Sequence, residues 1–303
     1  MPFVIPFISE KPENMDIADF MIGTIKEHLK DVLSCKPDLI VLSEVCDRPR
    51  GMPWEDVRAY YDRRGNKVEQ ALAQIARENG CYIAAGLARD DAQGNRYNSC
   101  VMFDRKGNVA GYYDKNYIVP WETDRCGILP GKDITVFECD FGRVGAVICY
   151  DLNFEEMRTK YREANCDLIV FPTHFDGGFL CRMFAHETGA YFVNCYSGGR
   201  PMSAAYDPLG NPIAESTIHY PFIVTDLNLD YEILHFDGNK EKLVEVMRKY
   251  GNEVRLIDPG YTGTAILLSE SAERTAKDIV KEFNLKTRAE QFAQGRAHRA
   301  KYI

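Results

Sequence analysis

The sequence predicts an α/β fold, a four-layer α-β-β-α sandwich in which two packed sheets lie between outer helices. Two observations carry this prediction. Short apolar segments typical of buried strands alternate with amphipathic segments typical of helices. The same order of segments also occurs twice, which indicates two similar halves related by pseudo-two-fold symmetry. Because the helices of each half cover only one side of its strands, the two sheets are expected to bury their other faces against each other.

Three sequence echoes, in the same order in both halves, support the internal repeat. They are an Asp-Leu-Ile-Val strand, a Glu-x-Gly-x-Tyr junction and an Asp-x-x-Gly-Asn turn, at 38–41 and 167–170, 78–82 and 187–191, and 104–108 and 207–211. A single doubly wound sheet is the alternative fold. The chain lacks the GxGxxG and GxxxxGK[ST] loops that would accompany it.

Hydrophobic spacing and helix-end signals place the elements of the first half. Apolar residues recur on one helical face of residues 15–33, and again around residues 68–76. An apolar strand at 38–44 separates these helices. Gly80 is placed to end the second helix as a left-handed cap. Residues 82–87 form the next strand, and a hairpin with the Asp-x-x-Gly-Asn turn closes the half.

The second half begins with a glycine-bounded apolar run at 142–148, which is typical of a buried strand. Residues 154–162 are expected to form a helix, because Asn153 is a suitable N-cap and two glutamates follow in the first turn. Gly189 is expected to end a later helix, before the strand at 191–195.

The sequence changes character in its last quarter, and we expect one domain over 1–230 and a C-terminal extension over 231–303. The extension contains two expected helices, 240–250 and 271–283. Its basic, polar tail at 286–302 is poor in large apolar residues. We expect the tail to pack on a partner subunit as an arm, with a frayed terminus as the alternative.

The composition excludes several classes of protein. The 303 residues are 45% hydrophobic and 27% charged, as in ordinary globular proteins. The net charge of −8 and the absence of long basic runs argue against a nucleic-acid partner. No apolar segment approaches the ~18 residues of a membrane span, and no basic signal-peptide segment opens the chain. None of the ten cysteines forms a CxxC pair, so we expect no zinc or redox motif and a cytoplasmic location.

Cys149 is a candidate nucleophile because it lies where the expected strand at 142–148 gives way to the helix at 154–162. A thiol near the positive end of a helix is favoured as its thiolate. A strand followed by a turn, a nucleophile and a helix is a common way to present a reactive atom above a sheet. Any other cysteine is more simply explained as a small buried residue.

A cysteine nucleophile needs a base and a donor for the oxyanion. Glu44 ends the strand at 38–44, and burial among apolar neighbours would raise its pKa and suit it to general acid–base work. Lys115 also ends an expected strand. His174 lies at another strand end and is the alternative base, in the manner of a cysteine protease.

These segments resemble the Glu-Lys-Cys triad of the nitrilase superfamily, the carbon–nitrogen hydrolases. The matching motifs are Asp-Leu-Ile-Val-Leu-Ser-Glu at 38–44, Tyr-Asp-Lys at 113–115 and Gly-Ala-Val-Ile-Cys-Tyr-Asp at 145–151, and the strand at 167–173 also matches. The resemblance covers residues 20–228. It implies the α-β-β-α sandwich and a homodimer or larger homo-oligomer.

The resemblance also implies a role for each residue. Cys149 would attack a carbonyl or nitrile carbon. Glu44 would take the thiol proton, pass it to the leaving nitrogen and later activate water. Lys115 would hold the oxyanion together with the backbone N–H of Tyr150. Glu122 best matches the second carboxylate of the family, and two carboxylates near Lys115 should keep that lysine charged.

The Tyr150-Asp151 pair after the cysteine resembles the amidases more than the nitrilases, which tend to carry Trp-Glu there. The resemblance therefore implies hydrolysis of a small amide, with N-carbamoyl compounds and then nitriles as alternatives. The residues expected to bind substrate, with Arg182 as the candidate for a substrate carboxylate, are Tyr150, Trp121, His174, Phe175 and Arg182.

No metal or organic cofactor is implied, because thiolate chemistry on an amide needs none. A non-catalytic binding or scaffold protein is the alternative from a different class. The presence of Glu44, Lys115 and Cys149 together argues against that alternative.

Overall fold

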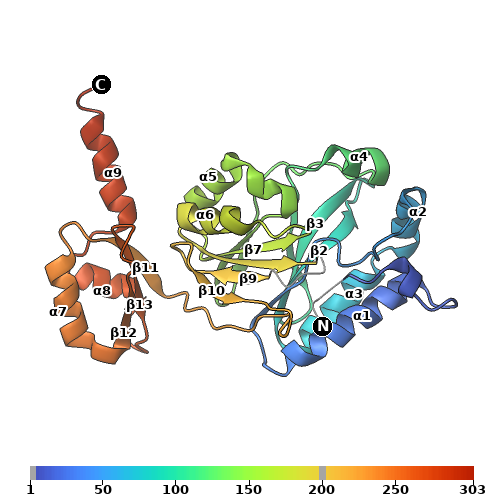
Figure 1. Ribbon diagram of the computed structural model, residues 1–303, viewed down its shortest axis with the longest axis horizontal. Helices are drawn as coiled ribbons and strands as arrows, with labels where there is room; N and C mark the ends of the chain where they lie inside the picture. The colour runs from blue at the N-terminus through green and yellow to red at the C-terminus, as the bar shows by residue number, and fades with distance from the viewer. Residues whose placement is uncertain (1–4, 198–202) are drawn as a thin grey trace. The chain divides into compact units, whose positions relative to one another are not determined.

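The chain divides between Thr225 and Asp226 into two compact units (Figure 1). The structure, a computed structural model, describes residues 5–197 and 203–303. The first unit contains both halves of the sequence repeat. The second unit has a hydrophobic core of its own.

Two sheets form the centre of the first unit. One has the strand order β1-β2-β3-β4, and the other has the order β10-β9-β8-β7-β6-β5. The strands are β1 (Leu39–Val41), β2 (Tyr82–Asp90), β3 (Arg96–Phe103), β4 (Val109–Asp114), β5 (Val136–Cys139), β6 (Gly142–Ala146), β7 (Leu168–Thr173), β8 (Tyr191–Tyr196), β9 (Ala204–Tyr206) and β10 (Pro212–Glu215). Strands β1 and β2 contact β7 of the other sheet, so the sheets pack face to face.

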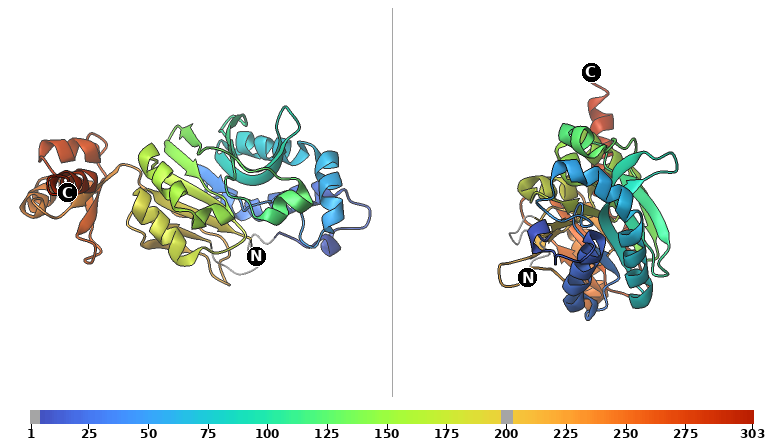
Figure 2. Two further views of the ribbon diagram at one scale, coloured as in Figure 1. Left: turned by 90° about the horizontal axis from the view of Figure 1, so that it is seen from above. Right: turned by 90° about the vertical axis from the view of Figure 1, so that its right-hand side faces the viewer.

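Helices cover the outer face of each sheet (Figure 1, Figure 2). α1 (Ile17–Leu33) and α3 (Lys67–Asn79) pack on the first sheet, and α5 (Glu155–Ala164) and α6 (Gly178–Thr188) pack on the second. This arrangement confirms the predicted four-layer sandwich. β7 is buried along its whole length, as expected for a strand covered on both faces. Beside these layers, α2 (Trp54–Arg64) contacts α4 (Pro120–Cys126).

The two halves share strand register as well as element order. β1 pairs in parallel with β2 so that Leu39 lies opposite Tyr82. β7 pairs in parallel with β8 so that Leu168 lies opposite Tyr191. Each pair is followed by two antiparallel strands, β3 and β4 in the first half and β9 and β10 in the second. The sequence echoes therefore mark structurally equivalent positions.

The predicted turn residues act as expected in both halves. Gly80 ends α3 at a φ of 63°, and Gly189 ends α6 at a φ of 72°, a conformation that costs glycine little. In the hairpin after β3, Asp104 Oδ1 accepts the backbone N–H of Asn108 at 2.8 Å. The equivalent bond of Asp207, after β9, is 2.9 Å long.

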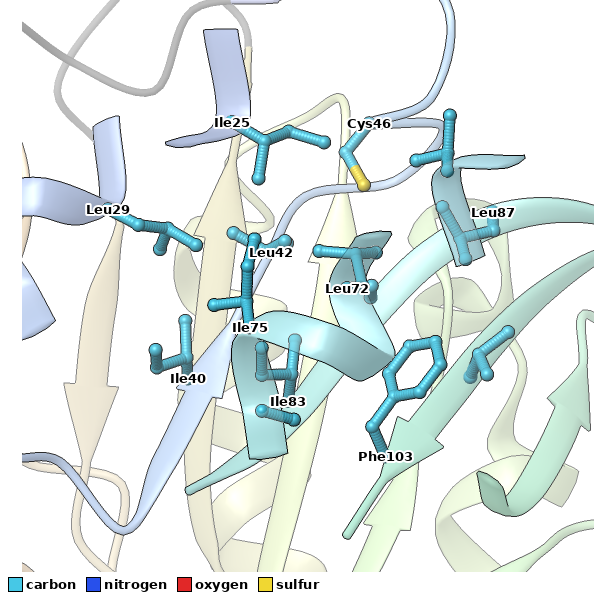
Figure 3. Packing of buried hydrophobic residues seen from close by; sticks show 14 of the residues in the cluster. Ile25, Leu29, Ile40, Leu42, Cys46, Leu72, Ile75, Ile83, Leu87 and Phe103 are labelled. Atoms are coloured by element: carbon cyan, nitrogen blue, oxygen red, sulfur yellow. The ribbon is translucent and has the colours of Figure 1, made fainter. Parts of the chain in front are cut away.

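A hydrophobic cluster joins α1 and α3 to the first sheet (Figure 3). Ile25 of α1 and Leu72 of α3 are each 1% exposed, and they pack with Ile83 of β2 and Phe103 of β3. Burying one such side chain contributes about 1.5–3 kcal/mol, so this face accounts for the helical spacing seen in the sequence.

The expected helix after Cys149 differs in detail. A short 3-10 helix, η2 (Cys149–Asn153), follows β6, and α5 begins only at Glu155. The prediction that Asn153 caps the helix is wrong. Asn153 lies inside η2, where its Nδ2 donates to the carbonyl of Tyr150 at 2.9 Å. Cys149 is therefore presented by a tight turn and not by the end of α5.

The second unit, Asp226–Ile303, contains the expected helix α7 (Lys240–Tyr250) and a shorter α8 (Ala276–Glu282). It also contains an unpredicted antiparallel sheet of order β11-β13-β12, formed by β11 (Tyr231–His235), β12 (Val254–Ile257) and β13 (Thr264–Ser269). The polar tail forms α9 (Arg288–Arg299), which contacts β11. Among the residues described, no helix is long and apolar enough to cross a bilayer.

Candidate active site

Three strand ends bring the predicted triad into one cavity of about 100 Å³. Glu44 follows β1, Lys115 directly follows β4, and Cys149 follows β6. The first two strands belong to one sheet and β6 belongs to the other. The cavity thus lies beside strand ends of both sheets, where the chain carries these polar residues. Glu122 of α4 also lines it.

Lys115 lies between two carboxylates. Its side chain is 1% exposed, and Nζ donates to Glu44 Oε1 at 2.9 Å and to Glu122 Oε2 at 2.8 Å. Burial alone would lower the pKa of Lys115, but the charges of Glu44 and Glu122 hold it well above its usual range. Lys115 thus lies beside both carboxylates that were expected to keep it charged. Two of its three N–H donors are used within the described residues, so one remains for a ligand.

The two carboxylate oxygens of Glu44 differ in their hydrogen bonding. Oε1 accepts from Lys115 and, at 2.8 Å, from Nδ2 of Asn98. Oε2 is buried and has no hydrogen-bond partner among the described residues. A buried carboxylate oxygen in this state is costly unless a reacting group uses it.

The expectation of a raised pKa for Glu44 is wrong. Burial does act to raise the pKa, but the charge of Lys115, together with the hydrogen bonds from Lys115 and Asn98, lowers it to about 2. The sequence pattern identified the apolar neighbours of Glu44. The expectation of a raised pKa considered burial alone and left out the effect of Lys115, whose Nζ lies 2.9 Å from Glu44 Oε1.

Cys149 adopts a left-handed backbone conformation with a φ of 45°. Non-glycine residues seldom adopt this conformation outside functional turns. Burial and the nearby Glu44 carboxylate raise the pKa of its thiol well above the usual range, while Lys115 and a hydrogen bond from the His174 backbone oppose this. The expected resting thiolate is therefore not supported, because the carboxylate lies close and the helix end is replaced by η2.

Asp151, to which the sequence motifs assigned no role, holds this turn in place. Its Oδ2 accepts the backbone N–H of Ile148 at 3.0 Å and the hydroxyl of Tyr113 at 2.6 Å. Its Oδ1 accepts the N–H of Tyr117 at 2.7 Å. Asp151 thereby joins the turn of Cys149 to the segment that carries Lys115. Burial raises the pKa of Asp151 to about 6.

Asn98 of β3 is a second missed residue. Its Nδ2 donates to Glu44 Oε1 and also, at 3.0 Å, to Glu122 Oε1. The two carboxylates are thus held by one amide and one lysine. Glu122 is further oriented by the N–H of Val119 at 2.8 Å, at the start of α4. No motif marks Asn98, since its position follows from the pairing of β2 with β3.

Two of the predicted substrate-binding residues, Trp121 and His174, line the cavity, and three do not. Tyr150 is 39% exposed and packs edge-on against Phe154. Phe175 packs edge-on against Phe171. Arg182 donates from Nε to the carbonyl of Gly210 at 2.9 Å. Arg182 therefore lies away from the cavity that contains Cys149.

His174 offers little support for a protease-like dyad. Its Nδ1 lies 2.6 Å from Ser197 Oγ, and its hydrogen bond with Cys149 comes from the backbone. Burial lowers the pKa of His174, so the ring is neutral near pH 7. Glu44 thus presents the open proton acceptor of this cavity.

The rest of the cavity wall comes from residues that no motif indicated. They are Val45, Arg48, Tyr61, Ala88, Val119, Cys126 and Ile128. Val45 has a φ of 49°, a strained conformation for a β-branched residue, so the chain turns sharply after Glu44.

Comparison with known proteins agrees with this geometry. The carbon–nitrogen hydrolase family profile matches residues 14–231. The omega-amidase NIT2 of Xenopus tropicalis is 24% identical over 250 residues, covering 72% of this chain and 89% of that protein. The human omega-amidase NIT2 is 25% identical over 227 residues, which cover 70% of this chain and 80% of that protein.

Solved structures share the fold. A cysteine-to-alanine mutant of the Nesterenkonia AN1 amidase, from the nitrilase superfamily, has a TM-score of 0.63 at 19% identity, covering 77% of this chain and 91% of that chain. Saccharomyces cerevisiae Nit3, of branch 10 of the nitrilase superfamily, has a TM-score of 0.58 at 20% identity. The match covers 72% of this chain and 84% of that chain. Because the family profile spans well over half of the chain and includes all three strand-end residues, the chain belongs to the carbon–nitrogen hydrolase family.

Proposed function

We propose that this protein hydrolyses a small amide through a thioester on Cys149. The observation that carries the proposal is the open Oε2 of Glu44, buried in the same cavity as a protonated thiol and the ammonium group of Lys115. A base without a competing partner, a nucleophile and a cation are the parts that acyl transfer needs.

In the first stage, Cys149 Sγ bonds to the amide carbon as its proton moves to Glu44. The negative charge that develops on the amide oxygen is stabilised by the remaining N–H of Lys115. The carbon–nitrogen bond then breaks, and the proton on Glu44 passes to the leaving nitrogen. The products of this stage are an amine, or ammonia for a primary amide, and a thioester.

In the second stage, Glu44 takes a proton from water, and the resulting hydroxide attacks the thioester carbon. The carbon–sulfur bond breaks, and the proton returns from Glu44 to the thiolate of Cys149. The net reaction consumes one water and yields a carboxylic acid. Lys115, whose pKa is raised by Glu44 and Glu122 against the effect of burial, remains a cation in both stages.

The relatives support this chemistry. Those named omega-amidase are similar over most of their length. In a glutamate-to-leucine mutant of the Nesterenkonia amidase, the acetamide moiety of fluoroacetamide is covalently added to the active-site cysteine, and that chain has a TM-score of 0.60 to this one at 19% identity. The cavity volume of about 100 Å³ suits a substrate of few heavy atoms.

Ammonia release from simple amides, ω-amides, N-carbamoyl compounds and nitriles tests the proposal. We expect wild type to hydrolyse amides, with a transient acyl adduct on Cys149 detected by intact mass. Cys149→Ala should show neither. Glu44→Gln, of equal size, should lose about 10²–10⁴-fold in kcat, the usual contribution of a general base.

The control is His174→Ala, which should retain turnover if Glu44 is the base. The proposal fails if His174→Ala abolishes activity and Glu44→Gln does not. It also fails if no substrate in the panel gives ammonia or an adduct, an outcome that would favour a binding protein. Release of carbon dioxide together with ammonia would indicate an N-carbamoyl substrate.

We further propose, from the family resemblance, a cytoplasmic homo-oligomer in which residues 231–303 contact a partner copy.

A further inference from the structure

We propose that Arg48 binds a carboxylate at the end of the substrate remote from the scissile amide. The preferred substrates would then be short amides that carry a free acid group. This inference rests on the proposed amidase function and adds the residue that selects the substrate.

Arg48 lies in the cavity wall together with Cys149. It lines the same cavity of about 100 Å³, in the turn that follows Glu44. The turn is held by the Arg48 N–H, which donates to the carbonyl of Val45 at 3.3 Å. A ligand that contacts both Arg48 and Cys149 therefore needs only a short linker between its two ends.

Arg48 forms no direct ion pair with a carboxylate in the described part of the chain, although Asp47 lies close enough to favour its charge. Among the described residues, no carboxylate oxygen lies within 4.0 Å of its guanidinium, whereas neighbouring arginines do form such pairs: Arg64 lies 2.7 Å from Asp47, and Arg89 lies 2.7 Å from Asp114. The carboxylates of the cavity, Glu44 and Glu122, contact Lys115 instead. The nearby Asp47 favours the charge of Arg48, but its carboxylate is already paired with Arg64. An anionic ligand would therefore give Arg48 its own direct partner.

Aromatic rings hold the guanidinium and leave its donors available. The guanidinium carbon lies 5.2 Å from the ring centre of Trp54 and 6.0 Å from that of Tyr61. The one polar side-chain contact of Arg48 within the described residues is from Nη1 to Cys126 Sγ, at 4.0 Å. Contacts with ring faces orient the guanidinium plane without using its N–H groups. The arrangement suits bidentate binding of a carboxylate.

The test compares two amides of the same shape, succinamate and succinamide. Succinamide has a second amide in place of the carboxylate of succinamate. Wild type should prefer succinamate. Arg48→Met should lower kcat/KM for succinamate by about 10- to 100-fold, mainly through KM, the size expected for a hydrogen-bonded charge pair. The succinamate-to-succinamide ratio should fall by a similar factor, and Arg48→Lys should restore part of it.

Arg125→Met is the matched control. Arg125 also lies over Trp54, with its guanidinium carbon 5.4 Å from the ring centre, but it is exposed and does not line the cavity. Its removal should leave the succinamate-to-succinamide ratio unchanged. Thermal melts of all variants would show whether a loss reflects misfolding.

Two outcomes would overturn the assignment. The first is that wild type shows no preference for succinamate over succinamide. The second is that folded Arg48→Met loses kcat/KM equally on both substrates. That result would mean that Arg48 only balances the charges of Glu44 and Glu122. Failure of the proposed function looks different, because neither substrate would then yield Cys149-dependent ammonia.

Discussion

Lys115 sets the charge state of the residues around it. Its ammonium group lies between Glu44 and Glu122, at 2.9 and 2.8 Å, and all three residues are almost fully buried. Opposite charges at this separation interact more strongly than they would in water. Against burial, the lysine lowers the pKa of Glu44 to about 2, while burial and the Glu44 carboxylate raise the pKa of Cys149. With these shifts, we expect the thiol to keep its proton in the substrate-free protein and Glu44 to be ionised, as the proposed mechanism requires.

The lowered pKa of Glu44 predicts a pH-dependent contribution to stability. A carboxylate with a pKa of about 2 in the folded protein and 4.5 as its reference value stabilises the fold above pH 4.5. That contribution, roughly 3 kcal/mol, is lost as the pH falls towards 2, with roughly half of it gone by pH 3. We expect urea unfolding of wild type to show this loss between pH 6 and pH 3. In Glu44→Gln the decline should be smaller, and parallel declines in the two proteins would contradict the assignment.

Close contact between two segments of the first sheet positions Glu44. The chain after β1 continues along β2, with the N–H of Cys46 donating to the carbonyl of Gly86 at 2.9 Å. A Cβ atom on Gly86 would lie 2.5 Å from Cα of Glu44 and 2.7 Å from the carbonyl oxygen of Ser43. Both of these are backbone atoms, so a rotamer change cannot relieve the clash. Gly86 is thus needed for its lack of a side chain.

Gly86→Ala should therefore displace Glu44. We expect a loss of about 10²-fold or more in kcat, because small displacements of catalytic groups are costly, together with a destabilisation of about 1–3 kcal/mol. The matched control is Gly23→Ala in α1, where an added Cβ meets no atom within 4 Å. That change should raise the free energy of unfolding by about 0.4–1 kcal/mol without affecting kcat. Full activity in Gly86→Ala would refute the close-contact argument.

At the scale of the molecule, the cavity depends on both sheets of the first unit. Glu44 and Lys115 follow strands of one sheet, and Cys149 follows a strand of the other. Neither half of the internal repeat contains the full triad. The second unit has a separate hydrophobic core, which includes Leu234 and Leu267.

The role of the second unit in assembly leads to a prediction for the whole chain. Light scattering coupled to size-exclusion chromatography should give at least twice the mass of one chain. Removal of residues 286–303 should reduce that mass if the tail packs on a partner copy. A monomeric full-length protein would contradict the prediction of a homo-oligomer. An unchanged mass after truncation would place the contact elsewhere.

The layers, the internal repeat and the three strand-end residues could all be predicted from the sequence. These features depend on local signals: hydrophobic spacing, left-handed glycine caps such as Gly80 and Gly189, and the turns at Asp104 and Asp207. Such signals act over a few residues and can be read along the chain. The sheet of the second unit was not predicted, although β13 is a short, fully buried apolar run of the kind that indicates a strand.

Only the tertiary structure determined the pKa shifts of the site and the residues that line its cavity. Lys115 lies 71 residues from Glu44 in sequence yet 2.9 Å from it in space, and this proximity reverses the pKa shift expected from burial. Asn98 and Arg48 carry no motif, and Asp151 lies in the cysteine motif without an assigned role. Arg182, the expected carboxylate binder, contacts Gly210 instead. Coulomb energies and cavity walls depend on distances across the fold, and residue spacing along the chain does not determine those distances.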